Sequence, residues 1–590
     1  MGNLLASFNA GVSGLHSAQA SLNTTSHNLA NAQTTGYTRQ QTVVTDSFYQ
    51  KSYGTYDNML LIGTGTVIAK TRQIRNTFLD EQYRVQLGRE SFYSANLDAS
   101  MEIEDMLGEL YGEQFSTSIN ELWESLQSLS ESPGDIVRRD QLVSVATQLV
   151  DRAQVLQTQL NTYQTSLNKE VQQQVDKIND IVSEVRKLNF EIRKYEANGE
   201  SANDYRDKRN DYLDQLGSLI NFEVNEEKDG TITIYSEGAF LLDTANQYFL
   251  KTEYESATSQ LLKPVWATGG DYFLRSSLEY STEQKTDIGS LRGIMVARGN
   301  YAANYTSVPH RPEEKDYTVG GTFDETAYNK ALAKFNKDLE TYNQSIGASV
   351  VMQIQTQIDT LVHSLVTSVN NVLSPLKEVT LADGSKIRIL DEEKALIGDD
   401  DNETMGAELF SRRSVERYTK ETVTLQGGIT KDVYRYNEED PSDPYSLYTI
   451  NQLTVNPVVQ RDPSALPTKN NKESGKYGGF AHDEWVEMAD AVHETVGVLN
   501  PNSRTTYNVF GYYTEMVSEM ATTANIWSGI VTNQETTVTT IFNERQNVMG
   551  VSTDEELANL IQFQQCYNAS SRYITTVAEM LEYLIERLGG

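Results

Sequence analysis

Apolar residues recur every three or four positions from Leu149 to Tyr195, which is the pattern of a helix with one buried face. This stretch of about 47 residues predicts a single helix about 70 Å long, at a rise of 1.5 Å per residue. The same pattern predicts shorter helices over 76–110 and 115–131, and the Ser-Pro-Gly sequence at 132–134 ends the second of them. The N-terminal part of the chain is therefore expected to be largely helical.

The pattern changes in the middle of the chain. Short runs of β-forming residues over 222–224, 231–235 and 240–242, separated by Asp-Gly and Glu-Gly pairs, predict hairpins. Helical spacing returns over 325–374, and short strands, loops and acidic clusters are expected over 377–504.

The positions of proline agree with this division. Ten of the eleven prolines lie between Pro264 and Pro501, and the other is Pro133. Because proline is poorly tolerated beyond the first turn of a helix, both ends of the chain can be helical whereas the middle cannot. The predicted fold class is mainly α, with inserted β-rich domains carried on a helical trunk that both chain ends build.

The sequence predicts seven segments in chain order. They are a terminal assembly helix and turn at 1–45, a helical trunk at 46–221, an inserted mixed β domain at 222–344, a helix returning to the trunk at 345–376, a second inserted β and loop domain at 377–504, a further trunk segment at 505–545, and a C-terminal assembly helix at 546–590 that pairs with the first segment.

The N-terminal helix carries an apolar heptad seam, in which four large residues are spaced by seven and two more supply the partner positions. The seam consists of Leu5, Phe8, Val12, Leu15, Leu22 and Leu29. Gly11, Gly14 and Ala18 run beside it and permit another helix to approach closely. The first 38 residues contain no charged side chain, which is unusual for a helix with a solvated face.

The C-terminal helix carries a similar seam. It begins at a capping box formed by Ser552 and Glu555, and no Gly or Pro interrupts it between Gly550 and Gly589. Its seam consists of Leu560, Phe563, Tyr567, Ile574, Val577, Leu581, Leu584 and Leu588.

Two interpretations of these terminal helices remain open. The helices can pair within one chain, or they can also pair between chains as a coiled-coil-like assembly element. The missing charges favour a position surrounded by other helices, and such contacts can propagate around a tube because they are heterologous.

A short motif follows the N-terminal helix, and it resembles the signature shared by bacterial flagellar rod, hook and hook-associated proteins. The motif residues are Ala30, Asn31, Thr34, Gly36 and Tyr37. Three further stretches, 75–84, 115–129 and 550–567, are similar to the hook-associated protein 1 family, with Cys566 standing where that family usually has a small residue. The resemblance covers about residues 1–222, 287–300, 345–375 and 507–590.

The resemblance implies a structural subunit of the junction between the flagellar hook and filament. The implied partners are copies of the chain in a tubular assembly, the hook protein, a second hook-associated junction protein, and an export chaperone that holds the C-terminal helix. Members of this family are exported unfolded through the flagellar type III apparatus. The expected location is therefore the extracellular flagellum, reached without a cleaved signal peptide.

Composition disfavours several kinds of partner and several structural features. The net charge of −33 disfavours nucleic acid and anionic lipid as partners, and no stretch reaches 18 consecutive apolar residues, so no membrane span is expected. The single cysteine, Cys566, excludes a disulfide within the chain. Residues 1–38 lack the basic start and the contiguous apolar block of a secretory signal peptide.

No catalytic motif is present, so we expect no enzymatic activity, cofactor or metal. His482 and His493 could share a helix face, but solvated polar residues are the simpler interpretation. Asp399, Asp401 and Glu403 begin like a calcium loop, but that loop's glycine and final glutamate are missing. Two alternatives stay open: a hook or distal rod protein, and, from a different class, a filament-displayed glycan-binding or hydrolytic module in the inserted domains.

Overall fold

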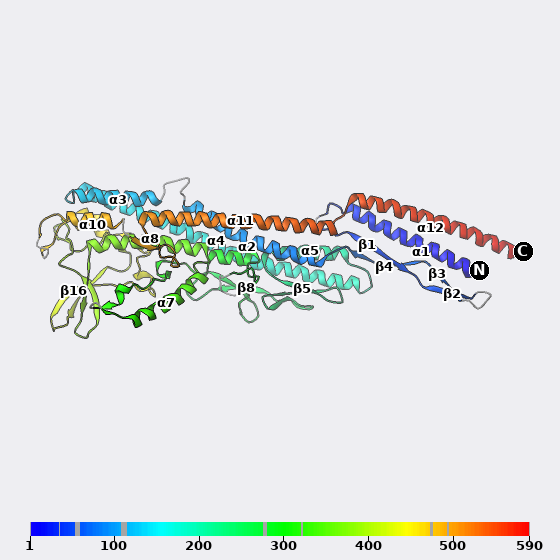
Figure 1. The fold of residues 1–590 in the computed structure, drawn as a ribbon, viewed down its shortest axis with the longest axis horizontal. Coiled ribbons are helices and arrows are strands. Elements are labelled where there is room, and N and C mark those ends of the chain that lie inside the picture. The colour runs from blue at the N-terminus through cyan, green and yellow to red at the C-terminus, as the bar shows by residue number, and fades with distance from the viewer. Residues whose placement is uncertain are drawn as a thin grey trace.

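The protein is long and narrow, and both chain ends lie at the same end of the molecule (Figure 1). The computed structural model describes residues 2–34, 36–53, 59–107, 115–274, 280–319, 322–472, 476–492 and 495–588.

The end that holds both termini is built from two helices and a β-ribbon, which together we call the terminal unit. Helices α1 (Gly2–Ala30) and α12 (Thr553–Leu588) pack against each other and run in opposite directions (Figure 1). Strand β1 (Gln40–Asp46) pairs with β4 (Thr66–Gln73), and β2 (Tyr49–Tyr53) pairs with β3 (Met59–Gly63), both antiparallel. The ribbon contacts α1.

The expectation of a helical trunk from residue 46 is wrong for residues 46–73. This segment forms most of the ribbon, because the β-branched residues of β4 pair with those of β1 and helical periodicity is absent. Gly65, at φ +110°, brings the ribbon onto α1, where a Cβ would lie 1.9 Å from Ser13 Oγ. The ribbon therefore belongs to the terminal unit rather than to the trunk.

The trunk consists of long helices from both halves of the chain, as the fold class predicts. They are α2 (Thr77–Leu107), α3 (Phe115–Glu131), α4 (Ile136–Glu196), α5 (Asn203–Leu219), α8 (Val350–Leu373) and α11 (Val509–Met549). Helix α11 packs on α2, and α4 packs on α3 and α5. The expected helix at 115–131 is confirmed, and the one expected at 76–110 is confirmed over 77–107, since residues 108–110 lie outside the described residues.

The longest helix begins earlier than its pattern predicted. Helix α4 has 61 residues rather than about 47, because Asp135 caps its first turn by accepting a hydrogen bond from Val137 N. Leu142, Val143 and Ala146 extend its buried face in the N-terminal direction.

The first inserted region lies along the trunk and contains the expected hairpins. Strands β5 (Glu223–Glu226), β6 (Ile232–Ser236) and β7 (Ala239–Leu242) form one sheet in that order, and β8 (Leu250–Tyr254) pairs with β9 (Leu262–Trp266). The remaining elements are α6 (Ser290–Arg298), η1 (Tyr305–Ser307), η2 (Glu314–Tyr317), β10 (Thr318–Val319), β11 (Thr322–Phe323) and α7 (Glu325–Gln344). The helical spacing expected over 325–374 is divided between α7 and α8, since Ser349 starts a new helix by capping Met352 N.

The second inserted region forms the end of the molecule opposite the terminal unit (Figure 1). Its sheet has the order β12 (Leu376–Thr380), β13 (Lys386–Leu390), β16 (Thr430–Tyr436) and β15 (Tyr418–Thr424). Its other elements are β14 (Phe410–Arg412), η3 (Pro444–Ser446), β17 (Leu453–Val455), α9 (Pro457–Arg461), η4 (Pro463–Ala465), α10 (His482–Ala491), β18 (Thr495–Val498) and β19 (Thr506–Asn508). Short strands dominate as expected, although α10 is a regular helix.

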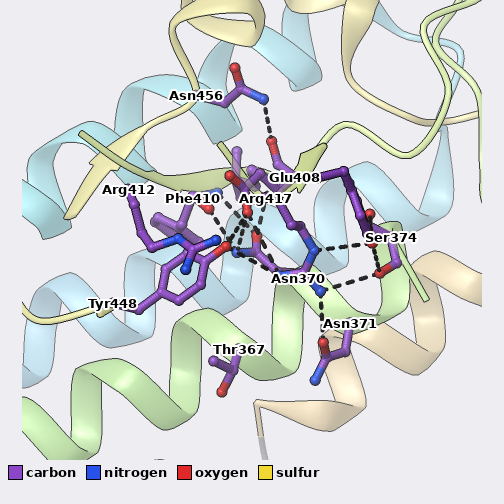
Figure 2. Close-up of polar contacts among 12 residues, drawn as sticks. Thr367, Asn370, Asn371, Ser374, Glu408, Phe410, Arg412, Arg417, Tyr448 and Asn456 are labelled. Carbon is purple, nitrogen blue, oxygen red and sulfur yellow. Dashed lines mark hydrogen bonds and ion pairs between the residues drawn. The ribbon is translucent and has the colours of Figure 1, made fainter. Parts of the chain in front are cut away.

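A buried polar network fastens this region to the end of α8 (Figure 2). Asn370 accepts hydrogen bonds from the backbone N–H groups of Leu409 and Phe410, at 3.1 Å each, and donates to the Phe410 carbonyl at 2.7 Å. Tyr448 donates its hydroxyl hydrogen to Glu408 at 2.6 Å, and Arg417 lies 3.7 Å from the same carboxylate. Because every one of these groups needs its partner once buried, the network fixes one position of the insert on the trunk.

A second polar contact joins both inserted regions to α8 and makes stability depend on pH. His363 Nε2 donates to Glu439 at 3.0 Å, and the Tyr305 hydroxyl donates to the same carboxylate. Burial alone would raise the pKa of Glu439, but His363 and Tyr305 together lower it to about 2.

We therefore expect Glu439 to stabilise the fold above about pH 4.5 and to lose this contribution as pH falls towards 2. A Glu439→Gln chain should show a shallower loss of unfolding free energy between pH 4.5 and 2, by about 1–3 kcal/mol, in urea titrations. The neighbouring Glu438 is exposed and serves as the control. A Glu438→Gln chain should lose as much unfolding free energy between pH 4.5 and 2 as the unchanged chain. An unchanged slope in Glu439→Gln would contradict the assignment.

Candidate assembly interface

The two terminal helices approach each other closely through the small residues of α1. A Cβ added at Gly11 would lie 2.9 Å from Ile574 Cγ1, and one added at Gly14 would lie 3.2 Å from Ser570 Oγ. The buried residues of α1 are all small or polar: Ala6, Gly11, Ser17, Ala18, Ser21, Thr25 and Asn28. A larger side chain at either glycine would push the helices apart.

Most residues of both predicted seams are half-buried in the structure. On α12, Val577 is 4% exposed, and Leu560, Phe563, Tyr567, Ile574, Leu581 and Leu584 are half-buried. The Leu588 side chain lies outside the described residues. On α1, Leu5 is 53% exposed, and Phe8, Val12, Leu15, Leu22 and Leu29 are only half-buried. Apart from Val577, the described large residues of both seams are thus left partly uncovered within one chain, and their role as an assembly interface stays a prediction.

Apolar side chains are also exposed on two other surfaces of the terminal unit. Six further apolar residues of α12, which do not share one face of the helix, are exposed: Leu557, Ile561, Tyr573, Met580, Tyr583 and Ile585. The ribbon exposes Val44, Phe48, Tyr49, Leu61, Val67 and Ile68. Large exposed apolar residues that gather in one part of a protein are typical of surfaces that another protein covers.

The motif after α1 forms the turn from the helix into β1. Asn31 Nδ2 donates to the His27 carbonyl at 3.0 Å, the Thr34 hydroxyl donates to Asn31 Oδ1 at 3.2 Å, and Gly36 has a φ of +79°. The Tyr37 hydroxyl donates to Asn28 Oδ1 at 2.8 Å. Ala30 is exposed. The motif residues therefore shape a turn, and no catalytic geometry is built on them.

Asn28 and Glu556 join α1 to α12, and the sequence does not predict this contact. Asn28, 1% exposed, donates to Glu556 at 3.0 Å and to the Gln40 carbonyl at 2.9 Å. Glu556 also accepts from Arg39 at 2.8 Å. Asn28 is one of many uncharged polar residues of α1, so no local signal distinguishes it, and none identifies its partner.

The same loop continues into contacts with α5. The Thr38 backbone N–H donates to Asp207 at 3.1 Å, and Gln73 Nε2 donates to the other oxygen of Asp207 at 2.7 Å. Burial raises the pKa of Asp207 to about 6, although Thr38 and the charge of Arg75 favour its ionised form. We call Asn28, Thr38, Arg39, Asp207 and Glu556 the joint, because they connect the terminal unit to the trunk.

A charged cluster beneath the joint ties α11 to the other trunk helices. Arg545 Nε lies 2.6 Å from Asp80 of α2, and its Nη1 lies 2.6 Å from Asp214 of α5. Arg84 adds a 2.8 Å contact to Asp214, and Arg75 pairs with Asp80. Because Arg545 is buried, donates a hydrogen bond to Asp214 and forms an ion pair with Asp80, it holds the end of α11 that leads into the terminal unit.

The residues considered above as metal ligands contact other groups in the described parts of the chain. Asp399 pairs with Lys469 and Arg139, and Asp400 accepts hydrogen bonds from Thr404. His482 bonds to the Ser130 carbonyl, and His493 lies outside the described residues. Among the described residues, no group of three or more His, Cys, Asp or Glu side chains is placed to hold a metal ion. None of the helices in the described ranges has the length and apolar character needed to cross a membrane.

The two chain ends match models of flagellar axial proteins. Residues 8–38 match the flagella basal body rod protein family, and residues 545–587 match the C-terminal region of the flagellar basal body rod FlgEFG proteins. These segments cover most of α1 and α12. The paired ends therefore define the class, which is a flagellar axial protein.

The middle of the chain and its full-length relatives identify the family. Residues 100–375 match the flagellar hook-associated protein FlgK helical domain. Flagellar hook-associated protein 1 of Bacillus subtilis (strain 168) is 24% identical over 589 residues, covering 98% of this chain and 96% of that protein. Its counterpart in Escherichia coli (strain K12) is 23% identical over 595 residues and covers 98% of both. The chain belongs to the flagellar hook-associated protein 1 family.

A solved structure supports the same fold. The flagellar hook junction protein FlgK from Burkholderia pseudomallei aligns with a TM-score of 0.50 at 13% sequence identity, covering 80% of this chain and all of that one.

Proposed function

We propose that the chain is a structural subunit of the junction between the flagellar hook and filament, and that it polymerises through its terminal unit. The observation that carries the proposal is the uncovered apolar surface on both helices and on the ribbon of that unit. Burial of such surface on association is favourable by about 25 cal/mol per Å². The partners we propose are neighbouring copies of the chain, the hook protein, a second junction protein and an export chaperone on α12.

The matched segments favour this function over a hook or distal rod protein. Rod and hook models match only the two ends, whereas the FlgK helical domain spans residues 100–375. A cell that lacks the chain should build hooks without filaments and shed monomeric flagellin into the medium. Normal filaments in such a cell would contradict the proposal.

The inserted domains offer less support for a hydrolytic role. A cleft of about 620 Å³ lies between residues 301–317 and α7, lined by aromatic side chains together with Asp316 and Asp338. Both carboxylates are exposed to solvent, whereas a glycosidase acid needs an apolar setting that raises its pKa. The geometry therefore favours a structural role for the chain.

Export is the part of the proposed function that a truncation tests. Removing residues 1–31 should leave a folded trunk that stays in the cytoplasm, because the proposed signal lies in the N-terminal segment. Immunoblots of medium and cells should show the truncated chain only in the cells, with the full-length chain as the control in the medium. Normal secretion of the truncated chain would argue against the type III route.

A further inference from the structure

The cleft between α7 and residues 301–317 has the size of a ligand site. Its volume of about 620 Å³ falls within the range of about 300–1,000 Å³ that is typical of small-molecule sites. Figure 1 shows α7 at the lower edge of the molecule, away from the terminal unit. One wall of the cleft is a single face of α7, because its lining residues recur every three or four positions: Ala331, Lys334, Phe335, Asp338, Thr341 and Tyr342. The whole lining comes from residues 301–346, so the first inserted region forms the cleft alone.

The wall opposite α7 has a fixed shape. Asn304 caps η1 by accepting hydrogen bonds from the Thr306 N–H at 2.9 Å and the Thr306 hydroxyl at 2.7 Å. Pro309 and Pro312 each hold the backbone φ near −65°. A cleft that is already shaped loses little conformational entropy when a ligand binds.

Aromatic side chains contribute much of the lining. They are Tyr301, Tyr317, Phe335 and Tyr342. Phe335 and Tyr342 are buried against the protein, whereas Tyr301 is 37% exposed and its ring is open to solvent. The face of an aromatic ring carries a partial negative charge, so it attracts the slightly positive C–H groups of a ligand.

Four charged side chains line the same cleft, and their charges balance. They are Arg311, Lys334, Asp316 and Asp338. In the described part of the chain, none of the four side chains forms an ion pair or a hydrogen bond, although Lys334 and Asp338 lie four residues apart on α7. Arg311 Cζ lies 5.4 Å from the centroid of the Phe335 ring, which positions the guanidinium without using its N–H groups. Hydrogen-bond donors and acceptors are therefore both available to a ligand.

A neutral oligosaccharide matches this combination of groups. A sugar ring presents C–H groups on its faces, which stack on aromatic rings, and hydroxyls that donate to carboxylates and accept from guanidinium and ammonium groups. The net charge of −33 disfavours a polyanion. A free amino acid matches the charges but fills only a small part of a cleft of this volume. The exposed carboxylates that argue against hydrolysis suit binding, since an ionised carboxylate accepts hydrogen bonds from hydroxyls.

We propose that the cleft between α7 and residues 301–317 is a binding site for neutral oligosaccharides. This inference goes beyond the proposed function, because a junction subunit needs no such site. It is tested on the purified chain, so its failure leaves the proposed function as it stands.

Binding of sugars to the purified full-length chain tests the proposal. The probes are maltotriose, cellotriose and triacetylchitotriose, with saturation-transfer NMR to detect binding and calorimetry to measure affinity. We expect at least one of them to bind. Asp338→Ala should weaken its affinity by about tenfold, because the sugar loses a charged hydrogen-bond acceptor. Glu340→Ala removes an exposed carboxylate of α7 that lies outside the lining, so this control should bind like the unchanged chain.

A second pair of variants tests the aromatic contact. Tyr301→Ala should also weaken the affinity by about tenfold, whereas Tyr254→Ala, at a 65% exposed position on β8, should leave it unchanged. Melting curves check that each variant is folded, and Asp338→Ala decides the test alone if Tyr301→Ala lowers the melting temperature. The inference is overturned if none of the three sugars binds, if a folded cleft variant binds as tightly as its control, or if glycine displaces the bound sugar.

Discussion

A Val577→Asp chain should fold, keep the melting temperature of its trunk and fail to support filament growth. Val577 is the most deeply buried apolar residue of α12, at its contact with α1. An unpaired carboxylate there costs several kcal/mol or separates the helices, and the terminal unit then loses its shape. The measurement is filament counts in cells whose own copy is deleted, together with a melting curve of the purified chain.

The adjacent residue provides the control for this experiment. Thr576 is exposed, and its hydroxyl donates to the Arg572 carbonyl at 3.1 Å. Thr576→Asp adds the same charge to the same helix turn, so it should affect filament growth much less. Filaments of normal number in Val577→Asp cells would show that α12 is an ordinary surface helix and not an assembly element.

An Arg545→Met chain should lose about 3 kcal/mol of unfolding free energy in urea titrations. The substitution leaves Asp80 and Asp214 without their shared cation, and breaking a buried ion pair costs about 3–5 kcal/mol. We expect the low end of that range, because Arg75 and Arg84 still pair with the two carboxylates. Filament growth should also fall, since Arg545 holds the end of α11 that leads into the terminal unit.

A surface ion pair is the matched comparison. Lys187 lies 2.6 Å from Glu184 on α4, and both side chains are exposed. Removing this pair with Lys187→Ala should leave the urea midpoint unchanged, because water screens it. If both variants lost the same unfolding free energy, the Arg545 cluster would stabilise the fold no more than a surface ion pair does.

Helical periodicity predicted most of the trunk because it is a local signal. The 3.6-residue pattern of 149–195 and 115–131 requires only neighbours in sequence, and its prediction failed mainly at helix ends such as Asp135. The part of the ribbon at 46–73 was missed because two-stranded pairing leaves most of its described side chains exposed, so no clean alternation of apolar and polar residues appears.

The candidate site was harder to predict than the fold. The apolar seam on α12 can be predicted from the heptad spacing of its residues. The contacts of Asn28, Asp207 and Glu556 cannot be predicted in this way, because their partners are far away in the sequence. Thr38 and Asp207 are 169 positions apart, and Asn28 and Glu556 are 528 apart. The seam on α1 was identified by its large residues, whereas the contact within one chain uses the small residues beside it, because close approach of two helices depends on small volume.

Because the first and last helices pair with each other, the terminal unit forms only in a chain that has both of them. Because Asn28 on α1 bonds to Glu556 on α12, the terminal unit can form only after α12, the last helix, has been synthesised. Closing so large a loop is among the last steps that a folding chain can take. A molecule that lacks the last helix therefore has a trunk but no terminal unit, and under the proposed function it should fail to join the assembly.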